Sequence, residues 1–224
     1  MKKVIFIDRD GVINKDPGGW TEYSYVTKCE DFVFIPDSLT ALKRLNDAGF
    51  GIVVISNQGG VSKGYFTEKD LNGINKKMME EIEKKNIKLK RVYYCIHQES
   101  DNCDCKKPKT GLFNKAEKEL GVIARGKYFI GDGKMDVEAG KKIGMKTILL
   151  LSGKTSMEDV KAWDVKPDFI CRDLSEAVDM VLGKHAENKK LKISAYTTQK
   201  YNSWRIRRSA MREGGKYQKY KPKT

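Results

Sequence analysis

Acidic residues follow two of the apolar segments in this 224-residue chain. Asp8 and Asp10 come directly after the first apolar segment, and Asp132 and Asp136 follow a later one. If both segments are parallel strands, their carboxyl ends lie at one edge of the sheet and bring the two acidic pairs together. Grouped carboxylates repel one another unless a hard cation neutralises them, and oxygen ligands of this kind suit Mg²⁺. The sequence therefore predicts a magnesium site.

A second group of residues suits an anion at the same edge. Ser56 and Asn57 end another apolar segment, and the Gly-Gly pair that follows allows backbone amides to approach a negative charge. Lys107, with Lys106 before it, adds fixed positive charge. Taken alone, Ser56 suggests a helix cap or a turn, and Lys107 suggests a solvated surface lysine. Together with the acidic pairs, the candidate phosphate-binding residues are Ser56, Asn57, Lys106 and Lys107.

Cysteine and histidine cluster in an eleven-residue stretch. The pattern Cys95-x-His97-x5-Cys103-x-Cys105 supplies three thiolates and one imidazole. Four such ligands complete a tetrahedral Zn²⁺ site with no open position, which is typical of structural zinc. The alternative is a set of free thiols near a surface histidine, but the polar residues between His97 and Cys103 offer no core for cysteines to enter. We therefore predict a structural zinc site that pins a loop beside the active site.

The segments that must position these groups alternate between strand-like and helix-like patterns. Short runs rich in β-branched and aromatic residues lie at Val4–Ile7, Ile52–Ile55, Val92–Tyr94, Tyr128–Ile130 and Thr147–Leu151. Helical patterns fall between most of these runs. This alternation predicts an α/β fold, a Rossmann-like parallel sheet with helices on both faces.

Start and stop signals place the helices along the chain. We expect helices at residues 37–49, from Thr67 onward, and at 110–120, 136–143 and 173–182, with a short edge strand over 167–171. Thr67 and Asp70 form a box-like cap, and the first helix begins at the capping residue Asp37. Gly183 stops the last helix. The folded domain is therefore expected to span 1–183.

The motifs occur in an order that resembles a known superfamily. Asp8-x-Asp10-Gly-Val, Ser56, Lys107 and Gly-Asp132-xxx-Asp136 are similar to the four motifs of the haloacid dehalogenase (HAD) superfamily. The resemblance covers about residues 1–183. Within the superfamily, the cysteine–histidine stretch is similar to the histidinol-phosphate and heptose-bisphosphate phosphatases. The resemblance implies a HAD-like fold and phosphatase activity.

The resemblance also implies a mechanism for the site. Asp8 is the expected nucleophile on phosphorus, and Asp10 is the expected acid to the leaving oxygen and then base to water. Ser56 and Lys107 are expected to hold the phosphoryl oxygens. The plain alternative for the first acidic pair is that Asp8 and Asp10 are solvated turn residues after a buried strand, and four motifs in order weigh against it.

The same resemblance implies how magnesium is held. The expected ligands are Asp132, a carboxylate oxygen of Asp8 and the backbone carbonyl of Asp10, with Asp136 supporting them. A helix-capping role is the alternative for Asp136.

Superfamily members that carry a cap domain insert it after the first motif or between the second and third motifs. In this chain the intervals 11–55 and 57–106 are filled by ordinary loops, helices and strands together with the zinc loop, so we expect a capless enzyme. Substrate choice then falls to the aromatic loop 15–25 and to the zinc loop ending at Lys106. Lys106 stands where related heptose enzymes usually show arginine, which puts a bidentate grip on the substrate in doubt.

These features favour a Mg²⁺-dependent phosphomonoesterase that acts through an aspartyl-phosphate on a small-molecule phosphate ester. The expected substrate is D-glycero-D-manno-heptose 1,7-bisphosphate, with removal of the 7-phosphate. Histidinol phosphate is the alternative substrate, because the gap between His97 and Cys103 is similar in both families.

The excess of positive charge is concentrated at the carboxyl end. The chain carries 44 Lys and Arg against 30 Asp and Glu, and residues 184–224 hold 13 of the former and two of the latter. Residues 1–183 are therefore nearly neutral, whereas 184–224 form a basic tail without an apolar period, which predicts disorder. This tail is interpreted as a solvated extension or as a contact for polyanions. The competing functional class is a nucleic-acid or membrane-surface binding protein that acts through it.

Targeting and membrane signals are weak. No apolar run reaches the roughly 20 residues needed to span a bilayer, and the amino-terminal run is too short for a secretory signal. The clustering of cysteines beside a histidine suits metal binding in a reducing compartment better than a disulfide framework. We therefore expect a cytoplasmic, monomeric protein without a transmembrane segment.

Overall fold

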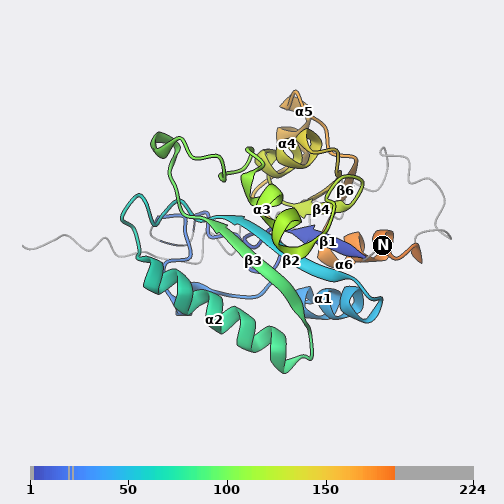
Figure 1. The fold of residues 1–224 in the computed structure, drawn as a ribbon, viewed down its shortest axis with the longest axis horizontal. Coiled ribbons are helices and arrows are strands. Elements are labelled where there is room, and N and C mark those ends of the chain that lie inside the picture. Colours follow the sequence, from blue (N-terminus) through green and yellow to red (C-terminus); the bar gives the residue numbers. More distant parts are fainter. Residues whose placement is uncertain (1–2, 20, 22, 185–224) are drawn as a thin grey trace, which may run out of the picture. The chain divides into compact units, whose positions relative to one another are not determined.

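Six parallel strands form one sheet at the centre of the fold (Figure 1). The computed structural model describes residues 3–19, 21 and 23–184. The strand order is β3-β2-β1-β4-β5-β6, so β1 lies between β2 and β4. The strands are β1 (Val4–Ile7), β2 (Gly51–Asn57), β3 (Leu89–Cys95), β4 (Tyr128–Gly131), β5 (Lys146–Leu150) and β6 (Phe169–Cys171). The predicted parallel α/β sheet is confirmed, including an edge strand within 167–171.

The central strands are apolar on both faces because helices cover both faces. All four residues of β1, Val-Ile-Phe-Ile, are buried, and Ile52 to Ile55 of β2 are fully buried as well. A strand that is covered on two sides reads as a continuous apolar run rather than as an alternation. This explains why short β-branched runs located the strands in the sequence.

Helices form a layer on each face of the sheet (Figure 1). The helices are α1 (Ser38–Asp47), α2 (Glu68–Lys84), α3 (Gly111–Leu120), α4 (Lys134–Lys142), α5 (Met157–Ala162) and α6 (Leu174–Val181). Apolar residues of α1, α2 and α6 share one core with the sheet, while those of α3 and α4 share the core on the opposite face. A smaller cluster joins α4, β5 and α5 through Val137, Leu149 and Val160. The short helix α5 was not predicted.

The helix ends confirm some predicted caps and correct others. Thr67 and Asp70 form the expected capping box at α2, and Asp173 caps α6 through the backbone N–H of Glu176. Asp37 was wrong as a capping residue: its φ of 65° is left-handed and its side chain makes no cap bond. Helix α4 begins at Lys134, two residues before the predicted start.

No inserted domain separates the motifs among the residues that the structure describes. A short 3-10 turn and α1 lie between β1 and β2, and only α2 lies between β2 and β3. None of the described helices has the length and apolarity needed to cross a membrane. The predicted disorder of the tail concerns residues 184–224, which apart from Lys184 lie outside the described residues.

Candidate active site

The predicted acidic residues converge at the carboxyl end of the sheet. Asp8 follows β1 and Asp132 follows β4, and these two strands are neighbours. Asp136 lies in the first turn of α4. Carboxylate oxygens of Asp8, Asp132 and Asp136 lie within 4.8 Å of one another, and all three residues are buried. We call this site, together with Asp10, the carboxylate crevice.

Lys107 is a buried cation inside the carboxylate crevice. Its side chain is 2% exposed, and its Nζ lies 3.0 Å from Asp8 Oδ2 and 2.6 Å from Asp136 Oδ1. It also donates to the backbone carbonyl of Ile55 at 2.9 Å. Asn57 fixes the backbone of Lys107, because its amide exchanges bonds of 3.0 and 2.9 Å with the Lys107 carbonyl and N–H. The structure thus places Lys107 beside the predicted nucleophile, Asp8. Asn57 holds the backbone of Lys107 in place.

Burial disfavours the charged forms of two carboxylates in the crevice. Burial raises the pKa of Asp8 to about 6; Lys107 opposes the rise, and Asp136 adds to it. Burial likewise raises the pKa of Asp132 to about 8, against the opposing charge of Lys154. Carboxylates crowded in this way are stabilised by a divalent cation with oxygen preference. The residues present therefore fit Mg²⁺.

Asp132 is enclosed by two glycines. A Cβ placed on Gly11 would lie 2.2 Å from Asp132 Oδ2, and one on Gly153 would lie 2.0 Å from the same oxygen. Gly11 also has a φ of +77°, a conformation that L side chains rarely adopt. The backbone N–H of Lys154 donates to Asp132 Oδ2 at 3.0 Å. The close approach of these backbones holds the carboxylate in one orientation.

Asp136 has the alternative role of a helix cap and also contacts Lys107, whereas its predicted support of the magnesium ligands stays a prediction. Its Oδ2 accepts from the backbone N–H of Gly133 at 3.0 Å, which satisfies a free N–H at the start of α4. Its Oδ1 pairs with Lys107. The cap therefore also orients the carboxylate toward the crevice.

Ser56, near the end of β2, and Asp10, in the turn after β1, face the crevice. Both line a cavity of about 200 Å³ together with Asp8, Asp132 and Lys107. Ser56 is 1% exposed, and its Oγ accepts from Gln58 Nε2 at 3.1 Å. The Asp10 carboxylate is turned toward the buried side chain of Arg9 rather than toward Asp132. Its expected metal contact, the backbone carbonyl, stays a prediction.

The mouth of this cavity carries the residues expected to select the substrate. Lys106 lines it and pairs with Glu99 at 2.9 Å. In the aromatic loop, Tyr23 stacks on Tyr65 with ring centroids 4.5 Å apart, whereas Tyr25 lines the cavity. The loop is therefore partly packed on its neighbours and partly available to a ligand. Its Trp20 lies outside the described residues.

Sequence reasoning missed three residues of the site. The first is Arg9, which lies between Asp8 and Asp10 in the sequence. The second is Lys154, which lies beside Asp132, and the Asp132 carboxylate is the main cause of its raised pKa. The third is Glu99, which lies in the zinc loop and pairs with Lys106. The only signal for Lys154 was its place after a glycine that follows a predicted strand. Nothing local indicated that Arg9 is buried.

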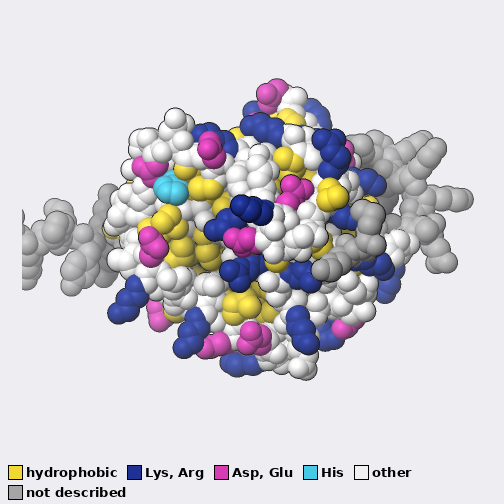
Figure 2. Space-filling model, viewed as in Figure 1, with side chains coloured by type: hydrophobic (Ala, Val, Ile, Leu, Met, Phe, Trp, Pro, Cys, Tyr) yellow, Lys and Arg dark blue, Asp and Glu magenta, His cyan; other side chains and the backbone are white. Residues whose placement is uncertain are grey.

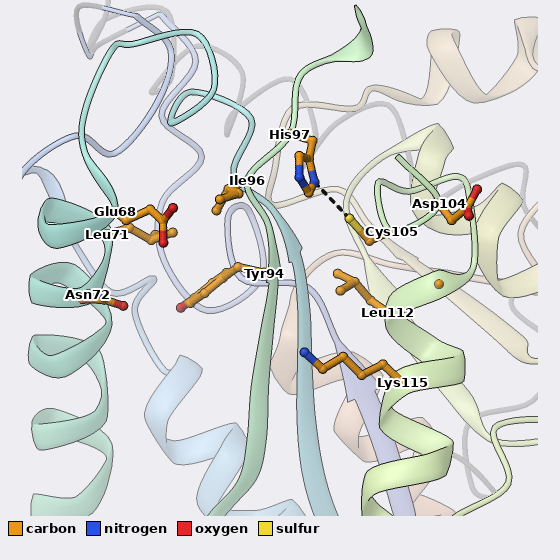
Figure 3. A pocket seen from close by; sticks show the side chains of 11 residues that line it. Glu68, Leu71, Asn72, Tyr94, Ile96, His97, Asp104, Cys105, Leu112 and Lys115 are labelled. Atoms are coloured by element: carbon orange, nitrogen blue, oxygen red, sulfur yellow. Dashed lines mark hydrogen bonds between the residues drawn. The ribbon is translucent and has the colours of Figure 1, made fainter. Parts of the chain in front are cut away.

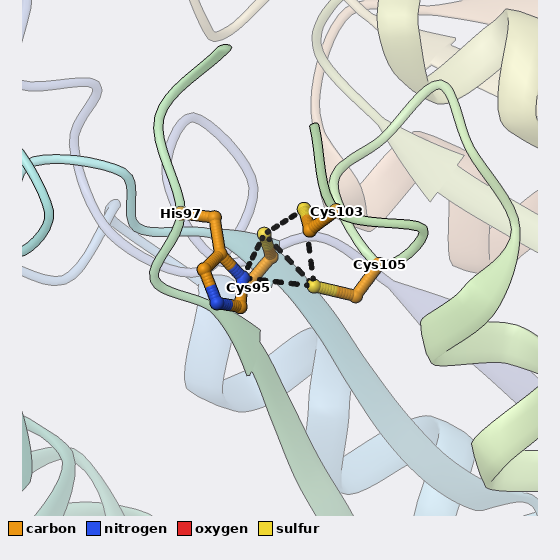
Figure 4. Close-up of side chains that lie close together, drawn as sticks. All are labelled: Cys95, His97, Cys103 and Cys105. Carbon is orange, nitrogen blue, oxygen red and sulfur yellow. Dashed lines mark hydrogen bonds between the residues drawn. The ribbon is translucent and has the colours of Figure 1, made fainter. Parts of the chain in front are cut away.

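The four predicted zinc ligands meet in space (Figure 4). Cys95 ends β3, and the other three lie in the following loop, with all five measured ligand separations between 3.2 and 3.7 Å. A tetrahedral zinc ion with bonds of about 2.0–2.3 Å places its ligand atoms roughly 3.5–3.8 Å apart. Two of the separations lie in this range, and three are shorter, at 3.2, 3.2 and 3.4 Å. Burial raises the pKa of Cys103, but hydrogen bonds from Cys105 and from backbone N–H groups outweigh it and lower the value to about 7. This cysteine–histidine cluster therefore fits zinc.

A larger cleft of about 640 Å³ runs along the outer edge of β3, between α2 and α3 (Figure 3). Leu71, Ile96 and Leu112 contribute apolar surface, and Glu68 and Lys115 lie on opposite walls. It borders the cysteine–histidine cluster through His97 and Cys105, but it contains no converging group of carboxylates. The converging carboxylates and Lys107 line the smaller cavity instead. Figure 2 shows charged side chains of both signs interspersed over this face of the molecule.

Known proteins resemble this chain over most of its length. The HAD-hydrolase-like family model matches residues 104–177. The D-glycero-beta-D-manno-heptose-1,7-bisphosphate 7-phosphatase of Pasteurella multocida is 33% identical over 190 residues, covering 82% of this chain and 98% of that protein. The protein of the same name from Helicobacter pylori (strain 26695) is 33% identical over 180 residues, covering 80% and 97%.

Solved structures give the same picture. The D,D-heptose 1,7-bisphosphate phosphatase of B. bronchiseptica, complexed with magnesium and phosphate, superposes with a TM-score of 0.74 at 27% identity. The alignment covers 81% of this chain and 99% of that chain. The D,D-heptose 1,7-bisphosphate phosphatase from Burkholderia thailandensis superposes with a TM-score of 0.61 at 25% identity, covering 81% and 99%.

Proposed function

Because the chain belongs to the HAD-like hydrolases and is a phosphatase of that family, we propose that it removes the 7-phosphate of D-glycero-D-manno-heptose 1,7-bisphosphate. The observation that carries this proposal is the crevice itself, where Asp8, Lys107 and three further buried polar groups converge on one cavity. The names of the relatives supply the substrate.

Asp8 is the nucleophile in this proposal. One of its oxygens attacks the phosphorus atom, and the bond from phosphorus to the sugar oxygen breaks, leaving an aspartyl-phosphate. Lys107 and Ser56 hold the phosphoryl oxygens, and the fixed charge of Lys107 opposes the charge that develops on them. Asp10 gives a proton to the departing sugar oxygen. It then accepts a proton from the water that hydrolyses the aspartyl-phosphate.

Asp8, Asp132 and the Asp10 carbonyl would hold Mg²⁺, with Asp136 orienting Lys107 beside them. The ion supplies positive charge that lets an anionic nucleophile approach an anionic phosphate. Cys95, His97, Cys103 and Cys105 would hold zinc in a closed, structural site. None of the five cysteines, all of which lie among the described residues, forms a disulfide, and this suits a cytoplasmic location.

A phosphate-release screen with Mg²⁺ tests the proposed substrate. The purified chain is assayed against both anomers of heptose 1,7-bisphosphate, histidinol phosphate and simple sugar monophosphates. We expect the highest kcat/KM for one heptose bisphosphate anomer, with release of the 7-phosphate alone. Higher kcat/KM for histidinol phosphate would replace the proposed substrate while keeping the reaction.

The basic tail is proposed to act as a tether for polyanions. Truncation after Gly183 is expected to leave turnover of a small phosphate ester unchanged and to remove salt-sensitive binding to RNA or anionic vesicles, because 184–224 carry most of the excess charge. Unchanged RNA and vesicle binding by the truncated protein would refute the tether.

A further inference from the structure

Arg9 is a fully buried cation between the two catalytic candidates. Its exposed fraction is 0%, and its guanidinium lies 5.9 Å from the Phe32 ring centroid and 5.6 Å from that of Tyr94. Burying a guanidinium costs several kcal/mol unless a charged partner in good geometry offsets the cost. The partner is Asp10, which receives bonds from Nε at 3.2 Å and from Nη2 at 3.0 and 3.1 Å.

Two further buried side chains hold the same carboxylate. Asn14 Nδ2 donates to Asp10 Oδ1 at 2.8 Å, and Gln58 Nε2 donates to Asp10 Oδ2 at 2.8 Å. Asn14 and Gln58 are both 0% exposed. The turn after β1 returns Asn14 to this place, because the backbone N–H groups of Ile13 and Asn14 donate to the Arg9 carbonyl. Both oxygens of Asp10 are therefore fixed by donors from three side chains.

The carboxylates of the two aspartates consequently pair with different side chains. Asp8 pairs with Lys107 and accepts from the backbone N–H of Arg9 at 2.7 Å. Asp10 pairs with the Arg9 side chain. A single residue thus touches both carboxylates through different groups, and neighbouring carboxylates placed in different environments can take different roles.

We propose that Arg9, assisted by Gln58 and Asn14, is the positioning residue of the Asp10 acid–base. This inference rests on the proposed function of Asp10. When Asp10 gives its proton to the sugar oxygen, it becomes a carboxylate, and the fixed charge of Arg9 stabilises the negative charge that remains. The bidentate contact also keeps the carboxyl group from rotating away between proton release and proton uptake.

Leaving-group dependence tests this role. A sugar alkoxide needs a proton as it departs, whereas 4-nitrophenolate does not. Arg9→Lys keeps a positive charge but cannot form the planar two-point contact. We expect the rate constant for aspartyl-phosphate formation, measured in a single turnover as release of the alcohol, to fall about 100-fold for a sugar phosphate and by less than about 3-fold for 4-nitrophenyl phosphate. This first step is compared because the later hydrolysis of the aspartyl-phosphate is common to both substrates. Equal losses on both substrates would overturn the proposal.

Other variants control for unspecific effects of the substitution. Arg44→Lys is the matched control, because Arg44 pairs with Asp179 between α1 and α6, away from the crevice, and no leaving-group effect is expected. If Arg9→Lys does not fold, Gln58→Met carries the test, with the same selective loss at a smaller size. Asp10→Asn is assayed in parallel. A selective loss in Asp10→Asn without one in Arg9→Lys overturns this inference alone, whereas equal losses on both substrates in Asp10→Asn overturn the acid role of Asp10 as well.

Discussion

The carboxylate crevice and the cysteine–histidine cluster lie at the same end of the sheet, but they are assembled in opposite ways. Asp8 and Asp132 are far apart in the sequence and meet because β1 and β4 are neighbours. The four cluster residues come from eleven consecutive positions at the end of β3. The crevice therefore depends on the fold, whereas the cluster shapes its own loop. A substitution in the crevice should therefore lower turnover, whereas a substitution in the cluster should lower the stability of the fold.

The largest expected effect is the loss of turnover in Asp8→Asn. The substitution removes the nucleophile and relieves a buried negative charge, so we expect phosphate release to fall at least about 10³-fold while the protein stays folded. Phosphate release and thermal melting measure the two results. Asp47→Asn, on the exposed end of α1, is the control. Turnover close to wild type in Asp8→Asn would remove the proposed nucleophile.

Cys103→Ser tests the other half of the comparison. We expect the variant to lose zinc, as measured by elemental analysis, and its Tm to fall by roughly 5–10 °C, because a structural metal contributes directly to folding. The affinity for substrate should fall too, since the loop leads directly to Lys106. Cys29→Ser, at a free thiol outside the cluster, should leave zinc and Tm unchanged. If wild-type protein stripped of zinc melts at the same temperature as the zinc-containing protein, the structural role of zinc is contradicted.

Magnesium should stabilise the protein in a pH-dependent way. The pKa values of about 6 for Asp8 and about 8 for Asp132 exceed the values of about 3.9 expected for unfolded chains. In the metal-free protein their ionisation therefore costs stability as the pH rises through this window, and Mg²⁺ offsets that cost. We expect MgCl₂ to raise Tm by several degrees near pH 8 and by less near pH 5.5. Asp132→Asn should abolish the shift, and an equal shift at both pH values would contradict the argument.

The smallest expected effect concerns Glu99 at the mouth of the crevice. The Lys106 side chain is 14% exposed and its partner Glu99 is 84% exposed, so a substrate anion can displace the Glu99 carboxylate. An exposed ion pair of this kind is worth roughly 0.2–1 kcal/mol. Glu99→Gln should therefore lower KM for a bisphosphate by about 2–5-fold without changing kcat. Glu80→Gln on α2 is the control, and an unchanged or higher KM in Glu99→Gln would contradict competition.

Local patterns predicted the strands, and the grouping of the acidic and cysteine–histidine residues, better than they predicted the residues that support the site. The first strand was placed at its exact bounds, because both of its faces are buried and all four residues are apolar. Arg9 was missed, because its burial depends on Phe32 and Tyr94, which only the folded chain brings to it. Asp37 was misassigned, because a capping residue type says nothing about the left-handed backbone found there.

The two edges of the sheet are protected from pairing with another chain. β3 has seven residues with an open side, and it carries the exposed Lys90 and Arg91. β6 has only three residues. Charged residues and short length on edge strands disfavour the extension of a sheet by a second chain, which is how many proteins avoid aggregation. Substituting Lys90 and Arg91 by β-branched residues would remove the charges that disfavour pairing at this edge. The protein would then be prone to form fibres at high concentration.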